Sequence, residues 1–146
     1  GRRGFRRAGR AGMSAGEGPH GGGWDGVGYK VVAKVGRRFL SVWAGDGTEY
    51  ALGATARDHA MPGHGGGLYV CCSAEAAAAH RIPARRGGLF MAPRRLLRCV
   101  CEGPFVWYPG GKVACSALTP VEELPLPAGY LHSAPQPRRP ASAPRP

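Results

Sequence analysis

The clearest change of pattern along the chain lies at residues 65–80, where glycine gives way to apolar residues and then to alanine. Three glycines at 65–67 precede the apolar run 68–72, and Ser73 opens an alanine-rich stretch that ends at His80. Aromatic and β-branched residues favour a strand, while serine before alanines, with Glu75 in the first turn, favours a capped helix. The pattern predicts a loop, a central strand and a short helix, around which the domain is arranged.

Short alternating runs before this stretch predict a meander. Residues 29–35 and 39–43 flank a loop that contains Gly36, which is typical of a hairpin. Residues 48–52 follow a turn with two glycines and supply a third strand.

The second half of the chain predicts one more strand and a second hairpin. In the strand 96–102, Leu97, Cys99 and Cys101 share one face, because side chains alternate along a strand. The runs 105–108 and 112–118 flank the turn Pro109-Gly110-Gly111, which predicts a hairpin.

Two segments lack a regular pattern. Residues 53–67 are poor in bulky apolar residues, so we expect a loop without structure of its own, and such long loops are often functional. Residues 119–127 contain three prolines, so we expect an ordered segment along the domain that is neither a regular strand nor a long helix.

These elements predict an α+β fold: a small single domain of short, mostly antiparallel strands, with two hairpins, a central strand and one short helix. We expect the domain at residues 29–127, flanked by a disordered Gly/Arg-rich tail at 1–28 and a disordered Pro/Ala/Arg-rich tail at 128–146. Trp24 is expected to be an exposed aromatic of the first tail rather than docked on the domain.

The composition shows that the chain is basic and says little else about function. The formal net charge is +11, and the excess of Lys and Arg is spread over both tails and the centre. Such charge permits weak association of the Arg-rich tails with a polyanion such as nucleic acid, although an Arg-, Gly-, Ala- and Pro-rich composition alone can produce it. No apolar run reaches the length of a membrane span, so we expect a soluble, intracellular protein without membrane contact. An Arg-rich start also leaves organelle transit open, and Met13 leaves the true start open.

The five cysteines are expected to be reduced and mostly buried as small apolar side chains. A zinc site is disfavoured, because Cys71 and Cys72 are adjacent on a strand and face opposite ways. A nucleophilic Cys–His pair is disfavoured too, since the sequence assigns no group that would orient His64 or His80. We therefore expect no metal and no cofactor.

The order of these motifs resembles an uncharacterised small domain that occurs in proteins of giant viruses, algae and other protists. The resemblance covers residues 29–127 and rests chiefly on GGGLYV with its short helix and on the GGKVACSALTP ending. It implies a domain boundary and no chemistry. The Arg/Gly-rich segment 84–95 and the doubled Cys71-Cys72 depart from the pattern.

A second, looser resemblance is to an ADP-ribosyltransferase-like fold, a split sheet around a nicotinamide-nucleotide cleft. It rests on the strand with Ser41, on the glycine loop that enters the Tyr69 strand, and on the late acids Glu122 and Glu123. It implies a small nucleotide-dependent transferase. Against it, both glutamates lie between prolines, where solvated surface is the simpler interpretation.

A third alternative is weak single-stranded nucleic-acid binding through arginines interleaved with aromatics. The residues concerned are Arg94, Arg95, Arg98, Trp107 and Tyr108. A solvated arginine face beside a packed tryptophan explains the same pattern.

The sequence favours a non-catalytic binding or protein-interaction module with an unknown protein partner, monomeric by default. The glycine loop marks the expected binding site, because successive glycines persist where the backbone needs positive φ or where something approaches it closely. The site residues are predicted to be His64, Gly65, Gly66, Gly67 and Tyr69.

Overall fold

A computed structural model of the chain describes residues 23–42, 48–80 and 92–130. The strands of these residues form one nine-stranded sheet, and every paired neighbour is antiparallel. The described part contains one short α-helix. The predicted antiparallel strands and short helix are therefore confirmed, but the fold is largely β and fits the α+β class only loosely.

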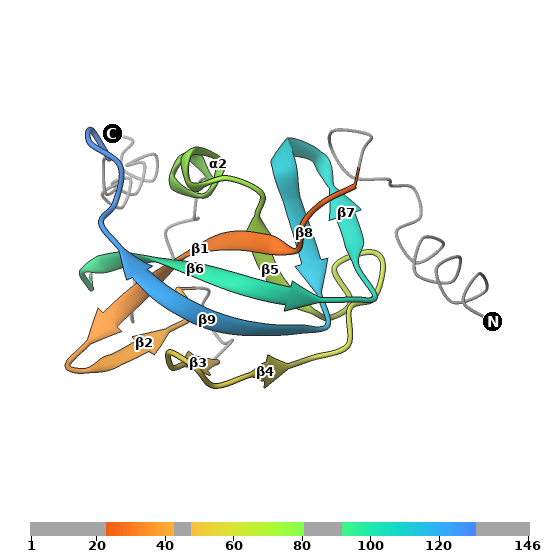
Figure 1. Cartoon of the computed structure of the whole chain (residues 1–146), viewed down its shortest axis with the longest axis horizontal. Helices are drawn as coiled ribbons and strands as arrows, with labels where there is room; N and C mark the ends of the chain where they lie inside the picture. Colours follow the sequence, from red (N-terminus) through yellow and green to blue (C-terminus); the bar gives the residue numbers. More distant parts are fainter. Residues whose placement is uncertain (1–22, 43–47, 81–91, 131–146) are drawn as a thin grey trace, which may run out of the picture.

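The sheet runs in the order β4-β9-β6-β1-β5-β8-β7, with β2 attached to β1 and β3 to β2. Figure 1 shows β5, β8 and β7 crossing the long strands β1, β6 and β9 at a steep angle, with α2 beside β1. The elements are β1 (Val27–Val35), β2 (Arg38–Leu40), β3 (Glu49–Tyr50), β4 (Ala56–Arg57), β5 (Leu68–Cys71), α2 (Ala74–Ala79), β6 (Arg94–Glu102), β7 (Val106–Tyr108), the 3-10 turn η3 (Pro109–Gly111), β8 (Lys112–Cys115) and β9 (Ala117–Leu124).

Two of the predicted turns and the predicted cap are confirmed, while the predicted turn at 44–47 lies outside the described residues. The β1–β2 hairpin turns at Gly36, which has φ of 64°, and the β7–β8 hairpin turns through η3, where Gly110 has φ of 81°. These positive φ values suit glycine, which has no Cβ to clash. Ser73 caps α2, because its hydroxyl accepts a hydrogen bond from the Ala76 amide at 3.0 Å.

The expectation that the proline-rich segment after Leu118 is not a strand is wrong. β9 runs through Pro120 and pairs with β6, and the register shifts between Arg98 and Cys99, directly opposite this proline. Proline has no N–H to donate, and an irregularity in the ladder tolerates that loss. The Pro120 carbonyl still accepts a hydrogen bond from Gly53 at 2.8 Å.

Two further expectations need correction. The segment 53–67 is not free of structure, because it contains β4, which pairs with β9, and a bridge between Met61 and Gly66. The expected single strand 112–118 divides at Ser116, so that β8 pairs with β5 and β7 while β9 pairs with β6. The Ser116 hydroxyl accepts from the Ala60 amide at 2.9 Å and donates to the Pro104 carbonyl at 2.9 Å, which fixes this corner.

The core consists of two clusters. The larger one includes Leu97, Cys99 and Cys101 from alternate positions of β6, as the sequence pattern predicts. In the smaller cluster, Ala77 of α2 packs with Val31, Cys71 and Leu96. The helix therefore covers the part of the sheet where β1, β5 and β6 meet.

Trp24 is packed, contrary to the expectation that it is exposed. Its ring makes edge-to-face contacts with Phe105 at 5.1 Å and Trp107 at 5.3 Å between centroids, and its Nε1 donates to the Val27 carbonyl at 3.1 Å. A large aromatic gains from such burial whether or not its neighbours in sequence are glycines. Regular structure thus begins at Val27, slightly before the predicted limit at Tyr29.

The expected tails lie mostly outside the described residues, at 1–22 and 131–146. The same holds for Trp43 of the first predicted hairpin and for most of the Arg/Gly-rich segment 84–95. The domain limits 29–127 stay a prediction. Within the described ranges, no helix has the length and apolar character that crossing a membrane requires.

Candidate functional site

A cleft opens where β1 and β5 separate. β1 pairs with β6 from Val27 to Ala33, but with β5 at Tyr29 opposite Cys71 only, and farther along it pairs with β2 instead. The space beside the diverging strands is an open cleft of about 400 Å³. This volume lies in the range of small-ligand pockets.

The walls of the cleft differ in character. Its apolar wall comes from β1, β5, α2 and the residues that follow β2, and comprises Val31, Val42, Val70, Cys71 and Ala77. Its polar lining carries two amines, two imidazoles, two phenols and a carboxylate, from Lys30, Lys112, His64, His80, Tyr29, Tyr69 and Asp58. An apolar wall with a few polar groups is the usual composition of a ligand site.

All five residues predicted as the site line this cleft: His64, Gly65, Gly66, Gly67 and Tyr69. The loop that carries four of them is a tight turn, in which the Gly65 amide donates to the Pro62 carbonyl at 3.2 Å. His64 lies at the tip of the turn with φ of 60°, a left-handed conformation that is uncommon outside glycine. The fold therefore brings the predicted residues together at one place.

The fold itself accounts for two of these glycines. Gly67 has φ of +105°, and a Cβ there would lie 3.0 Å from the Ala114 side chain. Gly66 lacks a positive φ, but a Cβ there would lie 2.7 Å from the His59 carbonyl oxygen. The close approach that the sequence suggested at Gly66 is thus made by the chain's own backbone.

A ring cluster of His64, Tyr69 and Tyr108 stands at the polar wall. The His64 ring stacks on Tyr108 at 4.3 Å and on Tyr69 at 5.7 Å between centroids. The Tyr108 hydroxyl accepts from the His64 amide at 3.0 Å and donates to the Met61 carbonyl at 3.4 Å. These contacts join the glycine loop to the β7–β8 hairpin.

Lys112 places its ammonium group at the ring cluster. Its Nζ lies 5.1 Å from the centroid of Tyr69 and 5.3 Å from that of Tyr108, within cation–π range of both. The same Nζ is 3.3 Å from Nε2 of His64, and when that nitrogen carries no proton it accepts a hydrogen bond from the ammonium. The amine is therefore held on several sides before any ligand arrives.

Lys30, also on the polar wall, supports strand β5. It is buried, its Nζ donates to the Tyr69 carbonyl at 2.7 Å, and it lies 5.3 Å from the centre of the Tyr50 ring. Tyr69 has a register partner on β8 and none on β1. The lysine thus hydrogen-bonds a carbonyl of β5 where the ladder to β1 has ended.

Burial raises the pKa of the Cys71 thiol, and the opposing effect of Lys30 and Lys112 is smaller. Burial is also the main cause that raises the pKa of the Tyr69 hydroxyl. Both groups are therefore protonated at neutral pH, and a protonated thiol is a poor nucleophile. The pKa of His80 is lowered, first by burial and then by Lys112 and Lys30.

The lining of the cleft includes none of the other four cysteines, of which Cys72 is partly buried. Cys99, Cys101 and Cys115 are buried in the larger core, and all five cysteines are free. Burial raises the pKa of Cys99 to about 12. Within the ranges that the structure describes, no three His, Cys, Asp or Glu side chains gather as metal ligands.

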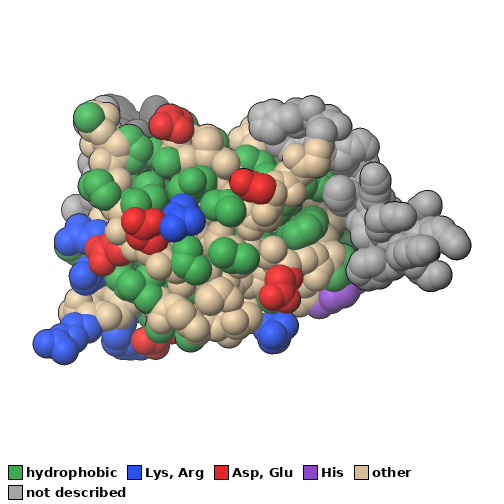
Figure 2. Space-filling view, in the orientation of Figure 1, with side chains coloured by type: hydrophobic (Ala, Val, Ile, Leu, Met, Phe, Trp, Pro, Cys, Tyr) green, Lys and Arg blue, Asp and Glu red, His purple; other side chains and the backbone are tan. Residues whose placement is uncertain are grey.

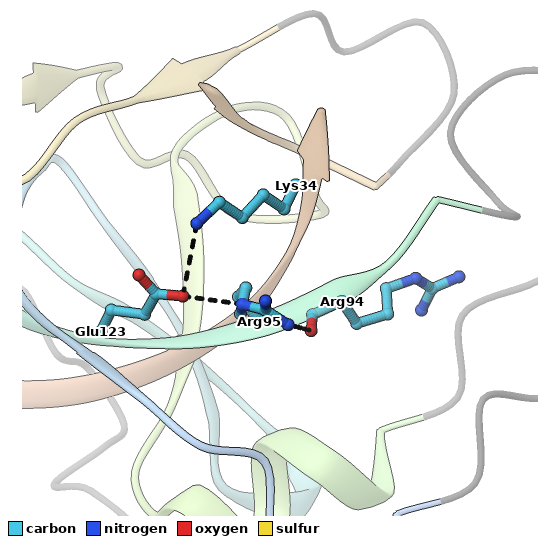
Figure 3. Close-up of polar contacts among 4 residues, drawn as sticks. All are labelled: Lys34, Arg94, Arg95 and Glu123. Atoms are coloured by element: carbon cyan, nitrogen blue, oxygen red, sulfur yellow. Dashed lines mark hydrogen bonds and ion pairs between the residues drawn. The ribbon is translucent and has the colours of Figure 1, made fainter. Parts of the chain in front are cut away.

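The acids of the transferase alternative lie elsewhere. Contrary to the expectation of an irregular segment, Glu122 and Glu123 lie on strand β9, where Glu122 pairs with Arg98 at 2.8 Å. Figure 3 shows Glu123 between Lys34 and Arg95, at 3.8 Å and 2.7 Å. The residues that line the cleft include Tyr69 but neither glutamate.

The arginines of the nucleic-acid alternative are engaged within the fold. Arg94 is buried, while Arg95 and Arg98 form the ion pairs with β9. Trp107 packs against Trp24. Figure 2 shows basic side chains beside acidic ones on the face that carries β6 and β9, rather than a purely positive surface.

The sequence interpretation did not assign Lys112, Tyr108, Lys30 or Asp58 to this site, and it named Tyr108 only for the nucleic-acid alternative. A signal for the first two existed, because the hairpin turn at 109–111 places Tyr108 directly opposite Lys112. Asp58 holds the loop, since its Oδ2 accepts from the Gly67 amide at 3.0 Å. Neither Lys30 nor Asp58 could be assigned before the packing of the loop on β5 was known.

Comparison of the chain with protein-family models, with curated proteins and with solved structures finds no significant match. The resemblance to the giant-virus, algal and protist domain over residues 29–127 therefore stays a prediction.

Proposed function

We propose that this domain is a non-catalytic binding module that holds a small ligand in the cleft between β1 and β5. The observation that carries the proposal is the cleft itself, about 400 Å³ in volume, with one apolar wall and one polar wall. The ring cluster and Lys112 are already fixed by internal contacts, so little ordering is needed when a ligand enters. Preorganised walls of this kind favour binding.

The chemistry of the lining supports binding over catalysis. The Cys71 thiol and the Tyr69 phenol are held protonated by burial, which leaves neither ready to act as nucleophile or base. The transferase alternative has less support, because Glu122 and Glu123 are engaged in ion pairs outside the cleft. Weak nucleic-acid binding has less support because the arginines concerned are buried or paired.

A fragment titration followed by NMR tests the proposal. Small aromatic compounds added to the ¹⁵N-labelled full chain are expected to shift the amide signals of Gly65, Gly66 and Val31 together. Matched alanine variants on α2 provide the control: Ala77→Leu narrows the cleft, whereas Ala79→Leu adds the same atoms at an exposed position.

We expect Ala77→Leu to weaken fragment binding several-fold and Ala79→Leu to leave it unchanged, with the folded state of each checked by its amide spectrum. If no fragment shifts the cleft amides, or if the shifts lie elsewhere in the domain, the proposed site is wrong.

A further inference from the structure

We infer that the ligand of this cleft carries a compact anionic group, a phosphate or a carboxylate, and that Lys112 binds it. The inference rests on the proposed binding function and adds the chemical class of the ligand. It comes from the charges that line the cleft and from the way Lys112 is held.

Lys112 is fixed in position but keeps hydrogen-bonding capacity. An ammonium group has three N–H donors. The described residues offer Lys112 one hydrogen-bond acceptor, Nε2 of His64 at 3.3 Å, and two ring faces. A ring face attracts the charge without replacing a directional acceptor, so donors remain for a group inside the cleft.

Four other basic residues provide a contrast. Arg38, Arg95 and Arg98 each pair with a glutamate at 2.7–3.0 Å, and Lys34 lies 3.8 Å from Glu123. Among the residues that the structure describes, Lys112 has no carboxylate partner within ion-pair distance. A positioned cation that faces a cleft without a counter-ion is a suitable anchor for an anion.

The residues around Lys112 also favour an anionic ligand in the cleft. Lys30 lines the same cleft, and both lysines contribute to the lowered pKa of His80, as expected where the potential is positive. The one carboxylate of the described lining, Asp58, already accepts a hydrogen bond from the Gly67 amide. An incoming anion therefore meets the Lys112 ammonium, while the buried Lys30 adds to the positive potential and the single carboxylate is already engaged.

The apolar wall determines the rest of the ligand. Val31, Val42 and Val70 lie in the same cleft as Lys112, so a ligand that reaches the amine also covers apolar side chains. A flat or apolar body with an anionic end fits both walls. A bare inorganic ion would use the polar wall alone.

Three probes of one shape test the inference: 1-naphthyl phosphate, 1-naphthoate and neutral 1-naphthol, each titrated into the full chain by NMR at low salt. We expect at least one anionic probe to bind tenfold or more tightly than naphthol. A larger gain for phosphate than for carboxylate, or the reverse, identifies which anion the site takes, and either result supports the inference.

Two variants that each lose one positive charge test whether Lys112 causes the preference for an anionic probe. Lys112→Met keeps most of the side-chain length and is expected to abolish the preference for the anion while naphthol still binds. Arg37→Met removes one positive charge from the exposed β1–β2 turn and is expected to keep the preference. Lys112→Arg retains the charge and should retain at least part of the preference, which guards against an effect of altered folding in Lys112→Met.

The outcomes separate the inference from the proposed function. Equal affinity for all three probes, with shifts at the cleft, would overturn the anionic ligand and leave the binding module intact. An anion preference that survives Lys112→Met would overturn the role of Lys112. Absence of binding by all three probes, together with a negative fragment titration, would overturn the binding module and this inference with it.

Discussion

The two sides of strand β1 are built differently. Toward β6 the ladder is continuous from Val27 to Ala33, whereas toward β5 it is limited to Tyr29 opposite Cys71. On the continuous side, the backbone groups of the neighbouring strands bond to one another throughout. The interrupted side leaves backbone and side-chain groups that must be satisfied in other ways.

The charged side chains on the two sides of β1 also differ in their partners. On the β6–β9 side, Arg95 and Arg98 meet glutamates, and Lys34 approaches Glu123. On the cleft side, Lys30 donates to a backbone carbonyl and Lys112 is held by aromatic rings. The proposed site therefore lies where the pairing of β1 with β5 ends, and where Lys112 has no carboxylate partner among the residues that the structure describes.

The largest expected effect concerns packing on the continuous side. Leu97 is fully buried on β6, so Leu97→Ala should lower the free energy of unfolding by about 2–5 kcal/mol through lost burial and a cavity. Val42→Ala at the cleft wall should cost about 1–2 kcal/mol, since fewer buried groups are removed and one side is already open. Urea denaturation of both variants measures the difference, and equal losses would contradict the division of β1 into a packed and an open side.

The next effect concerns the glycine loop on the open side. Gly66→Ala should destabilise the domain by about 1–3 kcal/mol, because the new Cβ would lie 2.7 Å from the His59 carbonyl oxygen. Gly23→Ala is the control, since a Cβ at Gly23 meets nothing within 4 Å. Thermal unfolding of both variants measures the effect. A Gly66→Ala protein as stable as Gly23→Ala, but with weaker fragment binding, would show that the glycine serves the ligand rather than the loop.

Local patterns made much of this fold predictable. The cap at Ser73, the turn at Gly36 and the alternation of Leu97 and Cys99 all depend on residues close in sequence, and all are confirmed. The sequence also located the loop that lines the cleft, because three successive glycines mark a backbone that turns sharply or is approached closely.

Tertiary context determined what the sequence could not. Pro120 fits within a strand because the register with β6 shifts opposite it. Trp24 is packed because Phe105 and Trp107, about 80 residues away in sequence, lie against its ring. Lys112 gains its contact with His64 only when the glycine loop packs on the β7–β8 hairpin. Such pairings between distant segments leave no trace in the local periodicity.

A smaller effect is expected for the charges of the continuous side. Glu123→Gln removes the partner of Lys34 and Arg95, and half-exposed ion pairs of this kind contribute about 0.2–1 kcal/mol. The loss should shrink at high salt concentration, because added ions screen the pairs. Glu102→Gln, at an exposed end of β6, is the matched control and should change little. An identical, salt-independent response of the two variants to urea would mean that the ladder of charges on β6 and β9 does not stabilise the sheet.

The smallest expected effect is a pH dependence that arises in the cleft. The folded state lowers the pKa of His80, through burial and then through Lys112 and Lys30, below the value of about 6.5 for an unfolded chain. As the pH falls through the pKa of the unfolded chain, the unfolded chain takes up the proton before the folded domain does. The contribution of this histidine to the free energy of unfolding therefore falls as the pH decreases from about 7.5 to about 5.5. His80→Gln should therefore reduce the difference in unfolding free energy between these two pH values, whereas His59→Gln, an exposed position outside the cleft lining, serves as the control.

Urea denaturation at both pH values measures the difference. If His80→Gln and the parent protein respond to pH in parallel, the cleft does not disfavour a further positive charge, and the contrast between the two sides of β1 loses its electrostatic part.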